Sequence, residues 1–154
     1  AVMEVILTAI QIYSDENSDD TVYDFLPKRS WEKLGTTDIK AQIWVNPALK
    51  AYGTADALTH FGMGENIPFE QLKPGSFINI NRTTKTGHAV VFLAFIDADG
   101  NEYTKYNDKV IGFKYFSSQG GYNAGTGGFD FRYAIFSTPD YEKNGYPQMP
   151  YKRD

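Results

Sequence analysis

The first stretch of the chain carries apolar residues at helical spacing. The apolar positions are Val2, Val5, Ile6, Ala9, Ile10 and Tyr13. This spacing places them on one face of an α-helix. We therefore predict an amphipathic helix over residues 1–13 whose apolar face packs on the core. The acidic, polar segment 14–20 predicts the end of that helix.

The second half of the chain has a different pattern. Short runs rich in Val, Ile, Phe and Tyr alternate with Gly, Asn and Asp turns at hairpin spacing. These runs predict strands at residues 76–81, 88–97, 102–107, 110–118 and 129–138. A Pro74–Gly75 turn leads into the first of them. The expected arrangement is an antiparallel meander.

The middle segment predicts helices that prolines interrupt. Residues 21–34 fit a short turn or a helix broken at Pro27, and a helical pattern from residue 36 stops at Pro47. A better helix spans 54–62, with Thr54 as its cap and Gly62 and Gly64 at its end. Helices followed by strands indicate an α+β fold with N-terminal helices packed on the sheet.

Length and composition set the domain organisation. A chain of 154 residues suits one domain, which we place at 1–138. The tail, 139–154, contains three of the seven prolines and little apolar periodicity. We expect it to wrap the surface or to be partly disordered.

Charge and residue types exclude several classes of function. The formal net charge is −4, so no basic field gathers phosphates and we expect no nucleic acid partner. No apolar run approaches the roughly 20 residues of a membrane span. The absence of Cys removes disulfides, thiolate zinc sites and a thiol nucleophile from the chain as given. With two His and no ligand spacing that supports a mixed His–carboxylate site, we expect no metal or other cofactor.

His88 is the first candidate for chemistry. It follows Gly87 and opens an apolar run that predicts a buried strand. An imidazole can take and return a proton near neutral pH, so His88 can act as a general base. The alternative is a polar residue that closes a loop.

Three short motifs behind the first helix carry a resemblance. They are KPGSF at 73–77, TGHAVVFLAF at 86–95 and YFSSQ at 115–119. Their order resembles the papain-like peptidoglycan cysteine hydrolases, the NlpC-type peptidases and CHAP amidases, over residues 1–14 and 72–136. In that superfamily a Cys heads the first long helix, a PGD-type turn precedes a strand, GH opens the next strand, and a polar residue orients the His. Ser76 stands where Asp is usual.

The resemblance implies a papain-like fold and an amidase or endopeptidase that cleaves an amide bond of peptidoglycan or its stem peptides. His88 would then serve as base and acid, with Gln119 as the first choice and Ser117 as the second choice for the orienting group. It also implies export or delivery to the bacterial envelope, as an antibacterial effector with an immunity or inhibitor protein as a partner.

The missing Cys leaves three explanations. Ala1 replaces a mutated nucleophile, the Cys lies just upstream of Ala1 and is lost from this chain, or the domain is a natural non-catalytic relative. A helix normally has a capping residue ahead of it, and none precedes Ala1, which favours the first two explanations. The intact protein is then an enzyme, although the chain as given lacks the nucleophile.

Two other functions compete with the hydrolase. One is a non-catalytic module of the same fold that binds glycan or peptide through an aromatic groove. The other is an unrelated cysteine-free α+β protein in which the GH pair is a coincidence.

Two segments offer substrate contacts. Arg82, near His88, is either a solvated charge or the partner of a substrate carboxylate. The glycine-rich segment 117–133 contains Tyr122, Phe129 and Phe131. It is either a flexible rim that lays aromatic surface against a sugar or peptide, or a long hairpin loop.

Two further motifs have structural explanations. Residues 97–102 begin like a calcium loop, but no Glu lies at the bidentate position, so a hairpin turn is favoured. His60, near the end of the helix predicted at 54–62, is best explained by interaction with helix carbonyls.

Overall fold

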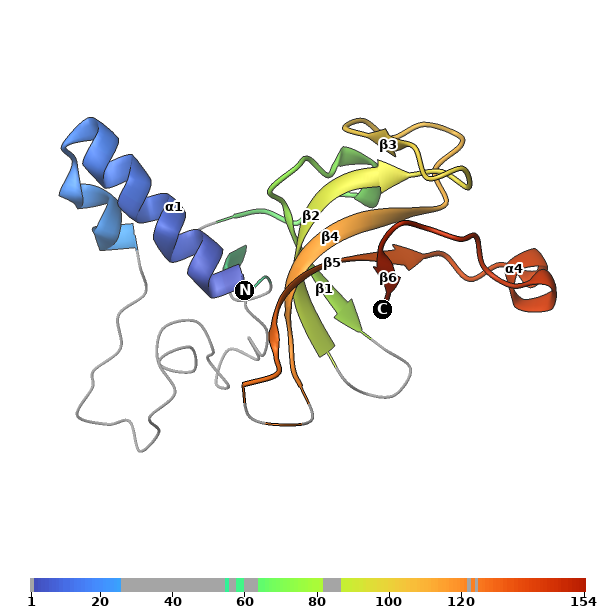
Figure 1. Ribbon diagram of the computed structural model, residues 1–154. Coiled ribbons are helices and arrows are strands. Elements are labelled where there is room, and N and C mark those ends of the chain that lie inside the picture. The colour runs from blue at the N-terminus through green and yellow to red at the C-terminus, as the bar shows by residue number, and fades with distance from the viewer. Residues whose placement is uncertain are drawn as a thin grey trace. The chain divides into compact units, whose positions relative to one another are not determined.

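The computed structural model describes residues 2–25, 55, 58–59, 64–81, 87–121, 123 and 125–154. They form a mixed α+β structure with an N-terminal helix and a six-stranded sheet (Figure 1). The α+β class is therefore as predicted. The chain divides into two compact units, one with residues 67–78 and 90–154 and the other with the described residues of 2–66 and 79–89.

Helix α1 (Val2–Asn17) confirms the N-terminal helix. Val2 and Ile6 on its apolar face are buried. Ala9 and Tyr13 are exposed, Tyr13 at 49%, so their predicted place on the packed face is wrong. The helix also continues beyond residue 13. The buried Ser14 supports this extension, since its hydroxyl donates to Asp20 Oδ1 at 2.6 Å. Ser18, with φ 51°, adopts the left-handed conformation that ends helices.

The rest of this unit is described in part. The 3-10 helix η1 (Asp20–Phe25) follows α1, and it covers the start of the segment predicted as a turn or broken helix. Residues 55, 58 and 59 are helical, as predicted for the segment 54–62, and Leu58 is buried. Thr54, His60 and the helix predicted from residue 36 lie outside the described residues.

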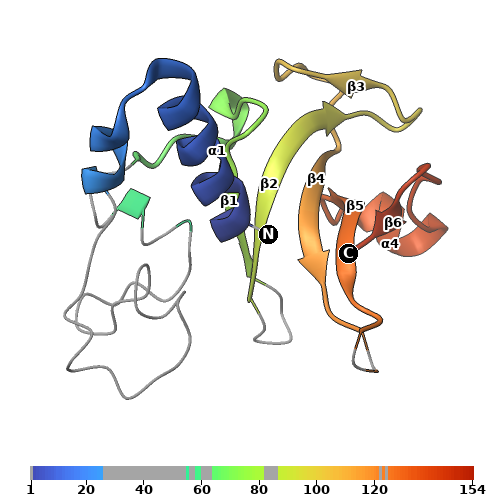
Figure 2. The same cartoon turned by 60° about the vertical axis from the view of Figure 1, so that its left-hand side comes forward.

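The sheet follows the predicted strand order. Its strands are β1 (Phe77–Asn81), β2 (Gly87–Ile96), β3 (Glu102–Tyr103), β4 (Gly112–Gln119), β5 (Gly128–Ile135) and β6 (Lys152–Arg153). The spatial order is β1-β2-β4-β5-β6, and β3 pairs with β2. Figure 2 shows β2, β4 and β5 side by side. Their pairings are antiparallel, and the β4–β5 pair is a hairpin of the predicted meander. The predicted pairing of the strand at 102–107 with the next strand is wrong, because β4 pairs with β2 and β3 lies off this path.

Two further parts of the sheet differ from the prediction. The strand expected at 102–107 ends at Tyr103, because the chain turns so that the Tyr106 ring packs edge-on against Phe69 and Phe95. The sheet is also mixed and not purely antiparallel, since β6 pairs with β5 in parallel.

The C-terminal residues belong to the same compact unit as the central strands. Helix α4 (Pro139–Asn144) begins where the Thr138 hydroxyl accepts a hydrogen bond from the backbone N–H of Tyr141 at 3.2 Å. Gly145, with φ 86°, ends it, and β6 follows. The segment 139–154 therefore contains a capped helix and an edge strand.

One face of the central strands forms an aromatic core. Phe92, Phe95, Phe113 and Tyr115 are all buried. Phe69, in the 3-10 helix η4 (Phe69–Gln71), contacts the rings of Phe95 at 5.3 Å and Phe113 at 5.7 Å between centroids. These edge-on and tilted contacts are the geometry that aromatic rings prefer. Phe92 and Phe95 lie opposite Tyr115 and Phe113, and they share this face because the β2–β4 register shifts between Phe92 and Ala94.

The turn before β1 ties that strand's start to β2. Gly75, with φ 93°, allows the turn at Pro74–Gly75. The Ser76 hydroxyl accepts from the backbone N–H of Lys73 at 3.1 Å. Gly75 N–H donates to Phe92 O, and Phe92 N–H donates to Ser76 O. The Ser76 side chain therefore closes the turn that precedes β1.

Candidate functional site

The end of β4 changes from aromatic to polar along a single face. Residues two apart on a strand share a face, so Ser117 and Gln119 continue the face on which Phe113 and Tyr115 are buried. Ser117 is fully buried, and Gln119 is partly buried. The amide nitrogen of Gln119 donates to the Ser117 hydroxyl at 2.6 Å. The two residues predicted as orienting groups are thus brought together.

The neighbouring strand places charges beside this pair. In the β4–β5 register, Asp130 lies opposite Ser117 and Arg132 lies opposite Tyr115. Arg132 Nε is 3.5 Å from Asp130 Oδ2, an ion pair without hydrogen-bond geometry. Lys152 Nζ is 3.7 Å from the same carboxylate oxygen. The polar end of this face is therefore built by β4, β5 and β6 together.

The geometry of the pair allows a positioning role. The hydrogen bond from the Gln119 amide nitrogen holds the side chain in one orientation. The amide oxygen of Gln119 is then held in a fixed position, where it can accept a hydrogen bond. Such an acceptor can fix the orientation of an imidazole N–H. The Ser117 hydroxyl is fully buried, which suits support of Gln119 and does not suit attack on a substrate.

Close backbone packing shapes the loop after Gln119. β4 and β5 pair up to Gln119 opposite Gly128, so much of the segment 117–133, predicted as a rim or a long hairpin loop, lies in these two strands. A Cβ at Gly127 would lie 2.6 Å from the Gln119 carbonyl oxygen. A Cβ at Gly121 would collide with Thr126. Glycine is therefore required on both sides of the neck of this loop.

Of the other predicted site residues, the structure describes only His88. His88 is the second residue of β2 and is partly buried. It belongs to the compact unit that contains residues 79–89, whereas Ser117 and Gln119 belong to the other unit. Ala1, Arg82 and Tyr122 lie outside the described residues.

The segment that begins like a calcium loop is a hairpin turn, as predicted. It joins β2 to β3, with Ile96 paired to Glu102. Asp97 Oδ1 accepts from the backbone N–H groups of Asp99 and Asn101, and Oδ2 accepts from the Asn101 amide and the Tyr103 hydroxyl. These hydrogen bonds, of which the one from the Asn101 side chain has the largest effect, lower the pKa of Asp97 to about 2. The Asp97 carboxylate thus stabilises the turn by accepting hydrogen bonds from its backbone and side chains.

Sequence reasoning missed a polar cluster on the opposite face of the sheet. Lys114 Nζ contacts Glu102 Oε1 and the Tyr151 hydroxyl, both at 2.9 Å, and that hydroxyl also contacts Glu102. Desolvation opposes both charges, yet the hydrogen bonds within the cluster lower the pKa of Glu102 and raise that of Lys114. Tyr151 is remote in sequence, so no local pattern could have identified it.

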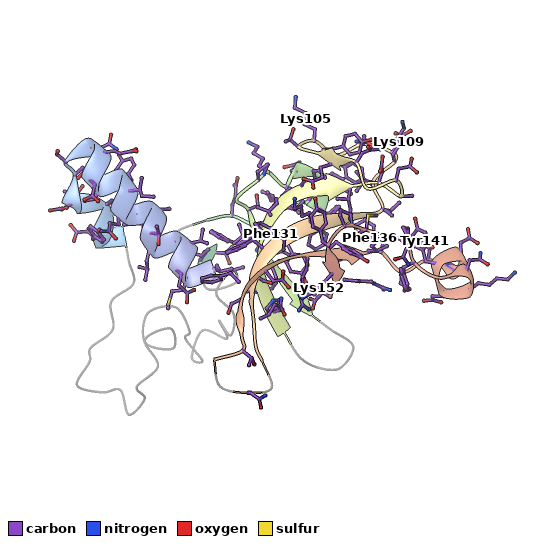
Figure 3. The ribbon with its side chains drawn as sticks, viewed as in Figure 1. Lys105, Lys109, Phe131, Phe136, Tyr141 and Lys152 are labelled. Carbon is purple, nitrogen blue, oxygen red and sulfur yellow. The ribbon has the colours of Figure 1, made fainter. Side chains whose placement is uncertain are left out.

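An exposed aromatic surface lies beside this cluster. Phe116 stacks on Phe129 at 5.3 Å between centroids and contacts Phe131 at 5.5 Å. Phe129 is 61% exposed and Phe131, labelled in Figure 3, is 50% exposed. Phe129 and Phe131 were predicted as a possible aromatic rim, but Phe116 was not. Period-two alternation along β4 and β5 would have placed all three on one face.

Comparisons with known proteins identify no relative: no family model, curated protein or solved structure matches the chain. Within the described ranges, no helix has the length and apolar character needed to cross a membrane. The part of the chain that the structure describes also holds no group of three or more His, Asp or Glu side chains that could bind a metal ion.

Proposed function

We propose that the chain is a papain-like domain of the peptidoglycan cysteine hydrolase class, an amidase or endopeptidase that acts on an amide bond of cell-wall peptides. The observation that carries the proposal is the hydrogen bond of 2.6 Å from Gln119 to the fully buried Ser117. Buried polar side chains need a partner, and this one immobilises an amide at the end of a core strand. The order of helix and then antiparallel strands supports the same proposal.

Each residue has a role in this reaction. A Cys thiolate attacks the amide carbonyl, and His88 first accepts a proton and then donates it to the leaving amine. Gln119 orients the imidazole through its amide oxygen, and Ser117 holds Gln119. In this proposal the nucleophile belongs at or beside Ala1, and the chain as given carries no Cys there. Arg82 binds a substrate carboxylate through its guanidinium.

The proposed setting follows from the substrate. Peptidoglycan lies in the bacterial envelope, so the protein is exported or delivered there. An effector of this type is accompanied by an immunity or inhibitor protein. The proposal also assigns Tyr122 to substrate binding.

Supplying the nucleophile tests the proposal. We would prepare Ala1→Cys, and separately the chain with one Cys added before Ala1, and incubate each with purified peptidoglycan. Mass spectrometry of the released muropeptides would identify the cleaved bond. In the active background, His88→Ala should lower the rate by about 10²–10⁴, the usual contribution of a general base.

Two controls separate catalysis from folding. Gln119→Ala should lower the rate less than His88→Ala and should alter the tautomer balance of His88, read from its ¹⁵N chemical shifts. Asp108→Ala changes an exposed turn residue and should leave the rate unchanged. If neither Cys variant released any muropeptide while both stayed folded, the hydrolase would be rejected.

A second candidate is the non-catalytic glycan- or peptide-binding module. The exposed Phe129 and Phe131 favour it, because contiguous exposed apolar surface marks interaction sites. It predicts that peptidoglycan fragments bind whether or not a Cys is supplied.

A further inference from the structure

The surface formed by Phe116, Phe129, Phe131 and Tyr151, here called the aromatic patch, lies on the face of the sheet opposite the aromatic core. The β4–β5 register pairs Phe116 with Phe131 and Ser118 with Phe129, and the core residue Tyr115 alternates with Phe116 along β4. Side chains of successive strand residues point to opposite faces. The patch therefore belongs to a different face from Ser117 and Gln119.

Ring geometry leaves apolar surface open to solvent. Phe116 and Phe129 are nearly parallel, with an interplanar angle of 28°. Phe129 and Phe131 keep 61% and 50% of their surface exposed. An aromatic face carries negative charge density and attracts polarised C–H groups. The patch thus offers adjacent rings on which a ligand with C–H faces can stack.

Polar atoms are held beside those rings. Lys114 Nζ lies 5.6 Å from the centroid of Phe131 and 4.2 Å from that of Tyr151. Its hydrogen bonds to Glu102 and Tyr151 fix the side chain in place. The cluster thus presents an ammonium, a carboxylate and a phenol in one preorganised group, which reduces the entropy lost on binding.

The charge at the patch selects against charged ligands. Lys114 and Glu102 carry one charge of each sign and are paired at 2.9 Å. A nucleic acid, an acidic peptide or an anionic membrane would require cations that are not already paired. The patch combines exposed rings with a hydrogen-bonding cluster whose two charges cancel. An uncharged ligand that has both C–H faces and hydroxyl groups fits this combination.

We propose that the aromatic patch, together with Lys114 and Glu102, is a binding site for an uncharged sugar chain. Pyranose rings stack on Phe129 and Phe131, and their hydroxyl groups exchange hydrogen bonds with the Lys114–Glu102–Tyr151 cluster. The site gives a location and a ligand class to the glycan-binding alternative above. It needs no nucleophile, so it holds whether or not the domain is a hydrolase.

NMR of the full chain with ¹³C-labelled Phe and Tyr rings tests the site. The probe is the tetramer of β-1,4-linked N-acetylglucosamine, which is uncharged, and we expect saturable shifts of the patch rings with roughly millimolar affinity. Phe129→Leu keeps an apolar residue but removes the ring, and should weaken binding about two- to tenfold. Phe129→Tyr keeps the ring and should bind like the unmodified chain.

Tyr106→Leu provides a matched control. The Tyr106 ring is also exposed, at 41%, but it contacts Phe69 and Phe95 on the core side of the sheet. This variant should retain binding. Thermal unfolding of every variant verifies that it is folded, and the high exposure of Phe129 predicts little change for Phe129→Leu.

Three results would overturn the proposal. The first is the absence of saturable shifts, and the second is equal affinity of Phe129→Leu and the unmodified chain. The third is a dimer in sedimentation that Phe129→Leu dissociates, which would assign the patch to self-association. Because the chain lacks Cys, binding is measured without turnover. A failure of sugar binding therefore leaves the hydrolase proposal standing. A failure of muropeptide release likewise leaves the sugar site standing.

Discussion

Replacing Gly127 with alanine should destabilise the loop that follows Gln119. The new Cβ would lie 2.6 Å from the Gln119 carbonyl oxygen and 3.2 Å from the Gly121 amide nitrogen. Both neighbours are backbone atoms, so no side-chain rotation relieves the clash, and the neck of the loop must widen. Overpacking of this kind costs about 1–3 kcal/mol.

One effect opposes that cost. Replacing glycine with alanine lowers the entropy of the unfolded chain and stabilises the native state by about 0.4–1 kcal/mol where the backbone tolerates a Cβ. Taken at the middle of the two ranges, the net loss for Gly127→Ala is about 1–2 kcal/mol. For a chain of this size, this corresponds to a fall in the unfolding temperature of roughly 2–8 °C.

Gly128→Ala is the matched control, one residue further along the chain. A Cβ at Gly128 meets no atom within 4 Å. This variant should be as stable as the unmodified protein or more stable by up to about 1 kcal/mol. Differential scanning calorimetry measures both changes, and the side-chain amide resonances of Gln119 report whether its hydrogen bond is kept.

Equal unfolding temperatures for the two variants would refute this reasoning. So would a Gly127→Ala protein that unfolds like the unmodified chain with unchanged Gln119 resonances. Either result would mean that the close approach of Gly127 to Gln119 does not constrain the loop.

Three further predictions concern other polar groups. Ser117→Ala should lower the free energy of unfolding by about 0.5–1.5 kcal/mol, through loss of a buried hydrogen bond, and broaden the Gln119 amide resonances. Asp97→Asn should be less stable at neutral pH. Because the folded pKa of Asp97, about 2, is below the ordinary value of 3.8, this difference should shrink as pH falls from about 4 to 2 in acid-unfolding curves. Lys114→Met should cost about 0.5–1.5 kcal/mol in urea unfolding, less in 1 M salt, since it removes an ion pair with Glu102 and cation–π contacts.

Part of the candidate site was predictable from sequence. The pairing of β4 with β5 was expected from apolar runs and turn residues, and Ser117 and Gln119 were selected from a short motif. Their joint position follows from the period of two along a strand. The full burial of Ser117 was not predictable, because it depends on what covers that face.

The aromatic patch was harder to anticipate for a similar reason. Phe129 and Phe131 alternate along β5, but alternation does not say which face is buried. Apolar aromatic residues are expected inside, and here Phe92, Phe95 and Phe113 occupy the core while Phe129 and Phe131 remain exposed. Only the tertiary structure distinguishes the two sets.

By itself, the sequence determined the elements whose signals are local. The spacing of apolar residues specified α1, and alternation with Gly, Asn and Asp turns specified β2, β4, β5 and the Asp97 turn, because helix and strand periods are set within a few residues. Only the tertiary structure decided the parallel pairing of β6 with β5 and the contact of Lys114 with Tyr151. These contacts join segments far apart in the chain, and their register depends on the packing of the whole sheet.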